Sequence, residues 1–489
     1  MMSMDEVQQL REEVKRLKQE NQELRERLMA AEATIKQLLE LLGQNSHNSN
    51  WPSSRDKSRR KTKSLRPKTE RKAGGQEGHE GHTLAFNPEP DVIEKHRPSE
   101  CAHCQAPLAE ESAASEVAKR QVLDLPPLRY ITTEYQVETA LCPNCGEATS
   151  GEFPAGVSNP VQYGSQVKRL AVYLHTEQFL PYERERQLLA DVFELPVSPG
   201  SLPNFVEAAA ITVVPATAAI KAAVIGAEVG HADETGFYIK GRRHWLHTVS
   251  TEELTYYEPH ARWGKEPHAR RGKKATDEIG ILPRFTGTLV HDAWATYFRY
   301  QLLLHALCNA HHLRDLTAIV ENDQQQWAAL MIACLLSAKE LVAAARQAGE
   351  TELSADCRER IHQLYEAIVC LGLAENPLPV SHSPPGKRGR RKKTKARNLV
   401  ERFDQHKAAI LRFVHDFKVP FDNNLAERDI RMMKVQQKIS GCFRSWDGAQ
   451  QFCRLRSYIS TIRKQGLNVW EALGSLFEGD VLMLQLTPE

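Results

Sequence analysis

The sequence has little net charge, no visible export signal and few long apolar segments. Its 64 Lys and Arg residues nearly balance 62 Asp and Glu residues, so the formal net charge is only +2. The N-terminus is charged rather than apolar, which argues against a secretory signal peptide. The apolar run over 208–227 contains Pro215 and Lys221, which disfavour insertion into a membrane and favour a buried helical segment. We therefore expect a cytoplasmic protein.

The balanced total conceals two strongly basic segments. The segment from Arg55 to Lys72 contains ten Lys and Arg residues and two acidic residues. The segment from Lys387 to Arg397 contains eight Lys and Arg residues and no acidic residue. Such segments are usually solvated, and the phosphate backbone of a nucleic acid is their commonest partner. A solubilising linker is the alternative interpretation of each.

The first 43 residues follow a heptad pattern. Apolar residues recur at alternating steps of three and four from Val7 to Leu42, and the only polar residue in this seam is Asn21. A buried Asn at such a position favours a paired, in-register, two-stranded coil. We predict a coiled-coil oligomerisation helix over 1–43, giving at least a dimer, with an intramolecular amphipathic helix as the alternative. Residues 44–95 predict a basic flexible arm, because they offer almost nothing apolar to bury.

Ten cysteines without a secretory context indicate reduced thiols, some of them metal ligands. Four of them form two C-x-x-C pairs: Cys101 with Cys104, and Cys142 with Cys145. Each pair places two thiolates at neighbouring corners of a tetrahedron, so we predict a structural Zn²⁺ site in a zinc-ribbon-like module over 96–155. The alternating segment 129–141 reads as a strand of this module. A redox pair or unused thiols are the alternatives.

Residues 160–225 have a helical pattern. The segments 184–195 and 201–210, separated by a Pro-Gly turn, resemble a helix-turn-helix. Many ordinary helical pairs look the same, so a DNA-binding region is only one of two interpretations here.

From residue 226 the pattern changes to strands. A first strand over 228–233 is followed by a meander, a helix near 276–282 and a further strand over 287–292. Antiparallel strands, a helix and a parallel fourth strand predict a ribonuclease-H-like α/β sheet in which strands one and four are neighbours. The fold class is therefore multidomain α/β, with the first part of the catalytic core over 226–304.

Two acids end these strands, and a third lies on a later helix. The predicted sheet brings Asp233 and Asp292 together at carboxyl strand ends, where open α/β folds place ligands. Two carboxylates at such a short distance repel each other unless a cation lies between them. A site that is rich in oxygen ligands and has room for a phosphate group suits Mg²⁺ or Mn²⁺. Glu427, on a helix over 425–438, would complete the set. A pair of such ions can cut and rejoin phosphodiester bonds.

Each acid also has a simpler explanation. A strand-end aspartate is often a cap or an ion-pair partner, and the helix of Glu427 could be an ion-paired surface helix. Glu234 and Asp429 are rival ligands. The basic side chains near Glu427 are the expected phosphate contacts: Arg428, Arg431, Lys434, Lys438 and Arg444.

Short motifs spread over nearly the whole chain match one protein family. They lie at 41–46, 74–82, 232–235, 291–297, 308–311, 423–428 and 440–444, together with the four paired cysteines. With these motifs the chain resembles the transposases of the insertion-sequence-66 family, a bacterial DDE group. It departs from the family pattern at Gly236, where proline is common, and at Asp315, where a basic residue is usual.

The resemblance implies that Asp233, Asp292 and Glu427 are the catalytic triad. It implies an enzyme that recognises transposon ends, nicks them and joins the 3′ hydroxyl to target DNA, with accessory proteins of the same element and association with the nucleoid. Two other functions fit part of the sequence: a dimeric zinc-containing DNA-binding regulator, and a nuclease of the same fold without strand transfer.

The segment between the second and third acids is longer than a compact core requires. Helical patterns over 327–345 and 355–371 predict an α-helical insertion with a basic loop over 305–400, before C-terminal helices of the core over 401–489. Cys308 and His311 match a C-x-x-H pattern that similar transposases carry after the second Asp. Two ligands alone rarely hold a metal, so packing support for the active site is the expected role.

Overall fold

A computed structural model describes most of the chain from residue 84 onwards. The described residues are 84–96, 98–108, 117–260, 273–378, 393–479 and 481–482, with Arg16, Gln19, Gln22, Glu23 and Glu26 near the N-terminus. Those five are helical and exposed. The seam of the predicted coiled coil, residues 44–83 of the basic arm and most of the second basic segment lie outside the described residues.

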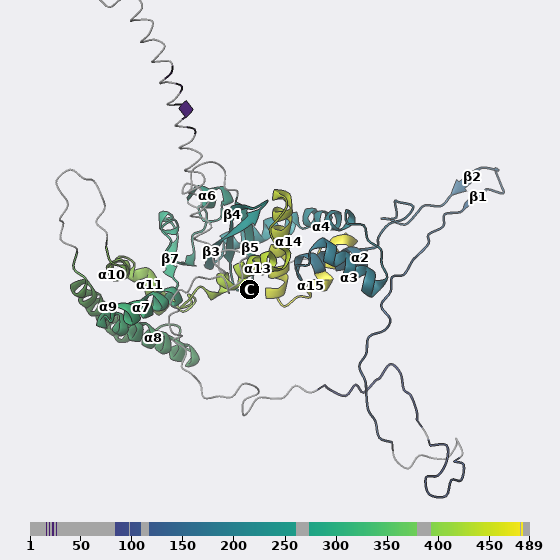
Figure 1. Ribbon diagram of the computed structural model, residues 1–489, viewed down its shortest axis with the longest axis horizontal. Coiled ribbons are helices and arrows are strands. Elements are labelled where there is room, and N and C mark those ends of the chain that lie inside the picture. Colours follow the sequence, from purple (N-terminus) through teal and green to yellow (C-terminus); the bar gives the residue numbers. More distant parts are fainter. Residues whose placement is uncertain are drawn as a thin grey trace, which may run out of the picture.

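The first strands form a small hairpin that projects from the rest of the molecule (Figure 1). β1 (Thr139–Leu141) pairs antiparallel with β2 (Ala148–Ser150) across the second C-x-x-C pair. The expectation of a strand over all of 129–141 is wrong, because 117–138 contains no strand. Its apolar side chains have no covering layer: Ile131 is 89% exposed and Val122 is 90% exposed.

Four helices follow the hairpin. They are α2 (Ser165–Thr176), α3 (Tyr182–Phe193), α4 (Ser201–Thr212) and α5 (Val214–Ile225). The apolar run predicted to be buried is divided between α4 and α5, which meet at an angle of 49°. Apolar side chains of α2 and α4 share a core with the last two helices, α14 (Trp446–Lys464) and α15 (Val469–Glu478). Segments from both ends of the described chain therefore build one helical layer.

The central sheet has the strand order β5-β4-β3-β6-β7. Its members are β3 (Val229–Ile239), β4 (Arg242–Ser250), β5 (Thr255–His260), β6 (Thr288–His291) and β7 (Leu304–Leu307). β3, β4 and β5 are antiparallel, whereas β6 and β7 run parallel to β3. The predicted meander and the adjacency of the first strand to the strand after the helix are confirmed. Two details differ: β3 continues through 234–236, where a break was expected, and β7 was not predicted.

Alternating side chains of the sheet bury its two faces against different helices. Phe237 and Leu246 pack with side chains of α14 and of α13 (Asn424–Ser440) on one face. On the other, Ala232 and Val249 pack with α5 and with residues in and after α6 (Lys273–Ile279). The sheet is thus the middle of a three-layer arrangement.

A helical unit inserted after β7 has its own core. It contains α7 (Asn309–Asp323), α8 (Gln326–Gln347), α9 (Ala355–Glu375), α10 (Lys395–Gln405), α11 (Lys407–Ile410) and α12 (Arg412–His415). Figure 1 shows this unit on the opposite side of the sheet from α2, α3 and α15. The two predicted helices correspond to α8 and α9. Of the described helices, α8 alone is long and apolar enough as an unbroken helix to cross a membrane, and its apolar side chains contribute to this core.

Candidate active site

The register of the sheet aligns the two predicted aspartates. β3 and β6 are paired from Val229 opposite Thr288 to His231 opposite Val290. Extending this parallel register by two residues places Asp292 beside Asp233, just past the last paired residues. Both residues are half-buried, and the Oδ1 atom of each accepts a backbone N–H bond, from Glu234 at 2.8 Å and from Trp294 at 2.9 Å. The aspartates are therefore neighbours, as the sequence predicted. Asp292 follows the end of β6, but the expectation that Asp233 also ends its strand is wrong, because β3 continues to Ile239.

Negative charge is concentrated around Asp233. Burial raises the pKa of its carboxyl group well above the ordinary value, and the charges of Glu234, Asp292 and Glu427 raise it further. Burial also raises the pKa of the Tyr297 hydroxyl, with additional contributions from Glu234, Asp292 and Asp233. The three predicted acids thus act electrostatically on one location, although they come from β3, the end of β6 and α13.

Asn423 fixes the start of α13 against β3. Its Nδ2 donates to the carbonyl of Ala232 at 2.9 Å, and its Oδ1 lies 2.9 Å from Nδ1 of His231. Because the amide oxygen is the acceptor in this arrangement, His231 donates from Nδ1, and burial lowers the pKa of its imidazole. The Asn423 carbonyl then accepts the N–H of Glu427 at 3.2 Å. A single buried amide therefore holds the first turn of α13, and with it Glu427, beside the strand of Asp233.

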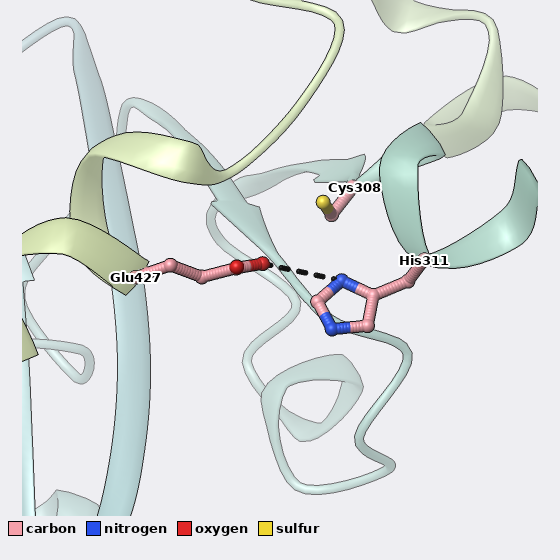
Figure 2. Close-up of side chains that lie close together, drawn as sticks. All are labelled: Cys308, His311 and Glu427. Atoms are coloured by element: carbon pink, nitrogen blue, oxygen red, sulfur yellow. Dashed lines mark ion pairs between the residues drawn. The ribbon is translucent and has the colours of Figure 1, made fainter. Parts of the chain in front are cut away.

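Two further candidate metal ligands, Cys308 and His311, lie close to Glu427. Cys308 precedes α7, His311 lies in its first turn, and Glu427 lies in the first turn of α13, so two helix starts face each other (Figure 2). Nδ1 of His311 is 3.5 Å from Oε1 of Glu427. One ligand atom from each of the three residues lies within 4.8 Å of the others. Burial raises the pKa of the Cys308 thiol to about 11, and its Sγ accepts the N–H of Asn423 at 3.1 Å.

The two rival acids have other partners. Glu234 accepts a 2.8 Å hydrogen bond from the hydroxyl of Tyr297, at the start of the 3₁₀ turn η2 (Tyr297–Arg299). Asp429 pairs with Lys464 at 2.7 Å and accepts a bond from Thr255 at 3.2 Å. Asp429 thus joins α13 to α14 and β5, which is a structural role.

The predicted phosphate contacts differ in their availability. Arg428, Arg431, Lys438 and Arg444 are exposed. Lys434 is half-buried and donates to the carbonyl of Gly236 at 2.6 Å. Burial lowers its pKa to about 8, and nearby Arg243 and Lys438 lower it further. Four of the five cations therefore face solvent, and the fifth braces α13 against β3.

Arg243 is a neighbour of this site that the sequence did not indicate. A Cβ atom placed on Gly236 would lie 2.6 Å from its Nε, so the guanidinium group covers the backbone of β3 at this glycine. The same group lies 4.7 Å from the ring centre of Trp245. A larger residue at position 236 would displace the guanidinium group of Arg243 from this position.

The four paired cysteines form two similar turns. The carbonyl of Cys101 accepts the N–H of Gln105, and that of Cys142 accepts the N–H of Gly146, with positive φ at Gln105 and Gly146. Backbone N–H groups within each turn lower the pKa values of the Cys101 and Cys142 thiols. Within the described ranges, however, the only group of three candidate metal ligands is Cys308 with His311 and Glu427. The two pairs are not gathered into one site.

The described helices provide no direct test of the helix-turn-helix interpretation. α3 and α4 correspond to its two helices, but α4 contains no Lys or Arg. Its buried side chains pack in the core shared with α2, α14 and α15. DNA binding by this region stays a prediction.

Comparison with known proteins identifies the region that carries this site. A family model described as Transposase IS66 family matches residues 161–451, and a model of a family of unknown function matches residues 3–85. No curated protein matches the chain. The first match covers more than half of the chain, from α2 to the start of α14, and includes all three predicted acids. The chain therefore belongs to the IS66 family of transposases, which are DNA-processing enzymes.

Proposed function

We propose that the protein nicks the ends of an insertion sequence and joins the freed 3′ hydroxyl to target DNA, with Asp233, Asp292 and Glu427 as catalytic acids. The observation that carries this proposal is the parallel register of β3 and β6, which aligns the two aspartates beside the first turn of α13. The strand order, with three antiparallel strands followed by two parallel ones, supports a ribonuclease-H-like core.

The residues present fit a pair of Mg²⁺ or Mn²⁺ ions. Burial and the neighbouring carboxylates raise the pKa of Asp233, and a cation there would relieve the repulsion between these carboxylates. Oε1 of Glu427 is shielded from solvent and has no hydrogen-bond partner among the described residues. Carboxylate oxygens are the ligands that these ions prefer. When bound, the ions would supply charge neutralisation at the attacking and leaving oxygens of the phosphodiester.

The protein's own side chains position the DNA. Arg428 and Arg431 are exposed on the helix that carries Glu427, and Arg431 lies one turn beyond it on the same face. Both can bind phosphate oxygens flanking the scissile bond, with Lys438 and Arg444 further along. Since the chemistry of phosphoryl transfer depends mainly on positioning and charge, no covalent protein–DNA intermediate is needed.

The remaining parts of the chain would hold the DNA ends together. We assign pairing of two chains to 1–43 and DNA contacts to the arm 44–95 and to the helical region 160–225. The four paired cysteines of 96–155 would hold a structural Zn²⁺ only if metal binding brings the two separate pairs together. The helical insertion, predicted over 305–400 and built in the structure by α7 to α12 (309–415), separates the two parts of the proposed catalytic core. Pairing of two chains suits a reaction that must bring two element ends together.

The test is a cleavage and joining assay with labelled element ends and Mg²⁺. Asp233→Ala is expected to abolish both nicking and joining while leaving DNA binding intact, because it removes a metal ligand but no exposed cation. The matched control is Asp356→Asn, an exposed acid on α9 of the helical insertion, which should remain fully active. Retained cleavage by Asp233→Ala would refute the assignment. Cleavage without joined products would indicate a nuclease, and binding without cleavage a regulator.

A further inference from the structure

We propose that Cys308, His311 and Glu427 form a second metal site, selective for a thiophilic divalent cation such as Zn²⁺. This part of the proposal is independent of the chemistry at the aspartates. A regulatory consequence, which rests on the proposed function, is that a cation bound here engages Glu427 and inhibits the Mg²⁺-dependent reaction.

The geometry is close to that of a tetrahedral site. The three ligand atoms lie within 4.8 Å of one another, and the His311–Glu427 separation is 3.5 Å. With bonds of roughly 2.0–2.3 Å, two ligands of one zinc ion are about 3.3–3.6 Å apart. One pair therefore already has the required spacing, and a small side-chain movement of Cys308 completes it. Figure 2 shows the three side chains converging from two helices.

Two of the ligand atoms have no polar partner among the described residues apart from their ion-pair contact with each other. Nδ1 of His311 and Oε1 of Glu427 are both shielded from solvent, and neither has a hydrogen-bond partner among the described residues. Buried polar atoms of this kind are costly unless something binds them. Facing each other at 3.5 Å, they leave a position that a shared cation would satisfy.

The donor set determines which cation binds. Sulfur and imidazole nitrogen select zinc and related ions over Mg²⁺, which prefers oxygen ligands. Binding displaces the Cys308 thiol proton to solvent, leaving a thiolate on the metal. The backbone N–H of Asn423 already donates to this sulfur at 3.1 Å and would support the thiolate. Three protein ligands leave a fourth position for water or for an oxygen of DNA.

The binding test uses the full chain and Co²⁺ as a spectroscopic substitute for Zn²⁺. Subtracting the spectrum of Cys308→Ser from that of the wild type cancels any contribution from the four paired cysteines. We expect a difference spectrum with a thiolate-to-cobalt charge-transfer band that saturates at one Co²⁺ per chain. Cys357→Ser, which removes a half-buried thiol from α9, should bind as the wild type does.

Variants of the other ligands keep this test decisive. His311→Ala should weaken the cobalt affinity at least about tenfold, since it removes a direct ligand. Asp233→Ala should leave the band unchanged, because Asp233 is not a ligand of this site. Absence of a difference band between wild type and Cys308→Ser, or an unchanged affinity in His311→Ala, would overturn the proposal.

Regulation is measured in the joining assay at saturating Mg²⁺. Added Zn²⁺ should inhibit the wild type at low concentration and be reversed by a chelator. The zinc concentration that halves activity, relative to each protein's own zinc-free rate, should rise at least about tenfold in Cys308→Ser. Equal zinc sensitivity of the two proteins would overturn the regulatory claim. A cobalt band together with an active Asp233→Ala variant would refute the proposed function and leave the second metal site standing.

Discussion

Glu185 is a buried carboxyl group without a hydrogen-bond partner among the described residues. It lies on α3, is fully buried, and neither carboxylate oxygen has a hydrogen-bond partner in the described part of the chain. Burial raises its pKa to about 9. Because the folded-state pKa is above the unfolded one, the contribution of Glu185 to stability is fully present below about pH 4.5 and is lost as the pH rises towards 9.

Replacing Glu185 with Gln should therefore stabilise the protein at neutral and alkaline pH. We expect the thermal midpoint of Glu185→Gln to exceed that of the wild type at pH 8, by the equivalent of a few kcal/mol, and to equal it near pH 4. Calorimetry across this pH range measures the difference. Glu183→Gln is the control on the same helix, since Glu183 is exposed and paired with Arg186 at 2.7 Å. A constant difference at all pH values would contradict the assignment.

At the scale of elements, the attachment of α13 to the sheet determines the position of Glu427. Asn423 is 2% exposed and makes two side-chain hydrogen bonds to β3, whereas its neighbour Asn424 is exposed. Asn423→Ala would leave the buried carbonyl of Ala232 and Nδ1 of His231 without these partners. The first turn of the helix would then lose its side-chain hydrogen bonds to the strand of Asp233.

We predict that Asn423→Ala lowers the free energy of unfolding by about 1–3 kcal/mol, the typical cost of unsatisfied buried polar groups. It should also reduce joining activity, because Glu427 is no longer held in place. Asn424→Ala should change stability by less than about 0.5 kcal/mol. Urea unfolding monitored by circular dichroism measures both variants. Similar losses in the two would show that the amide contacts are unimportant.

The sequence correctly predicted those helices and strands in which apolar residues recur at a regular spacing along the chain. The alternation in β3 and β4 and the long apolar stripes of α8 and α9 are of this kind. β7 was missed because His305 interrupts a strand of four residues. The segment 129–138 was predicted as a strand because it alternates, but alternation stabilises a strand only where another layer covers it.

The site was predictable to the extent that it depends on strand order. Once β3 and β6 are adjacent, their aspartates must meet, whereas Glu427 was assigned through motif resemblance. The contact between Cys308 and the start of α13 joins residues 115 positions apart. No local pattern encodes such a contact, although the C-x-x-H spacing marked one half of it. The sequence did not indicate Arg243, because the position of its guanidinium group over β3 depends on Gly236, a glycine of that neighbouring strand.

At the scale of the whole molecule, the helical layer joins distant parts of the chain. Side chains of α2 and α4 pack in one core with side chains of α14 and α15. The contributing residues of α14 and α15 lie after residue 451, where the matched family region ends. The buried members after residue 451 are Leu455, Tyr458, Ile459, Ile462, Val469, Ala472, Leu473 and Leu476. The buried pair of Glu177 and Arg456 also links α14 to the end of α2. The family region alone is therefore an incomplete folding unit.

A chain that ends at Gln451 should fail to fold. It keeps only the beginning of α14, and loss of the apolar surface that covers α2 and α4 should make the product insoluble or without cooperative thermal unfolding. A chain that ends at Leu482 retains all of the described packing and should unfold as the full chain does. Soluble yield and circular-dichroism melting compare the two. A cooperative transition in the shorter chain would refute this expectation.

The bond between His231 and Asn423 spans 192 residues. At about 5–20 residues per second, a ribosome needs roughly 10–40 s to synthesise that interval. For this time a nascent chain carries the strand of Asp233 but not the helix that delivers Glu427. Fragments released early by truncated translation would therefore lack Glu427, and under the proposed function they could not cut DNA.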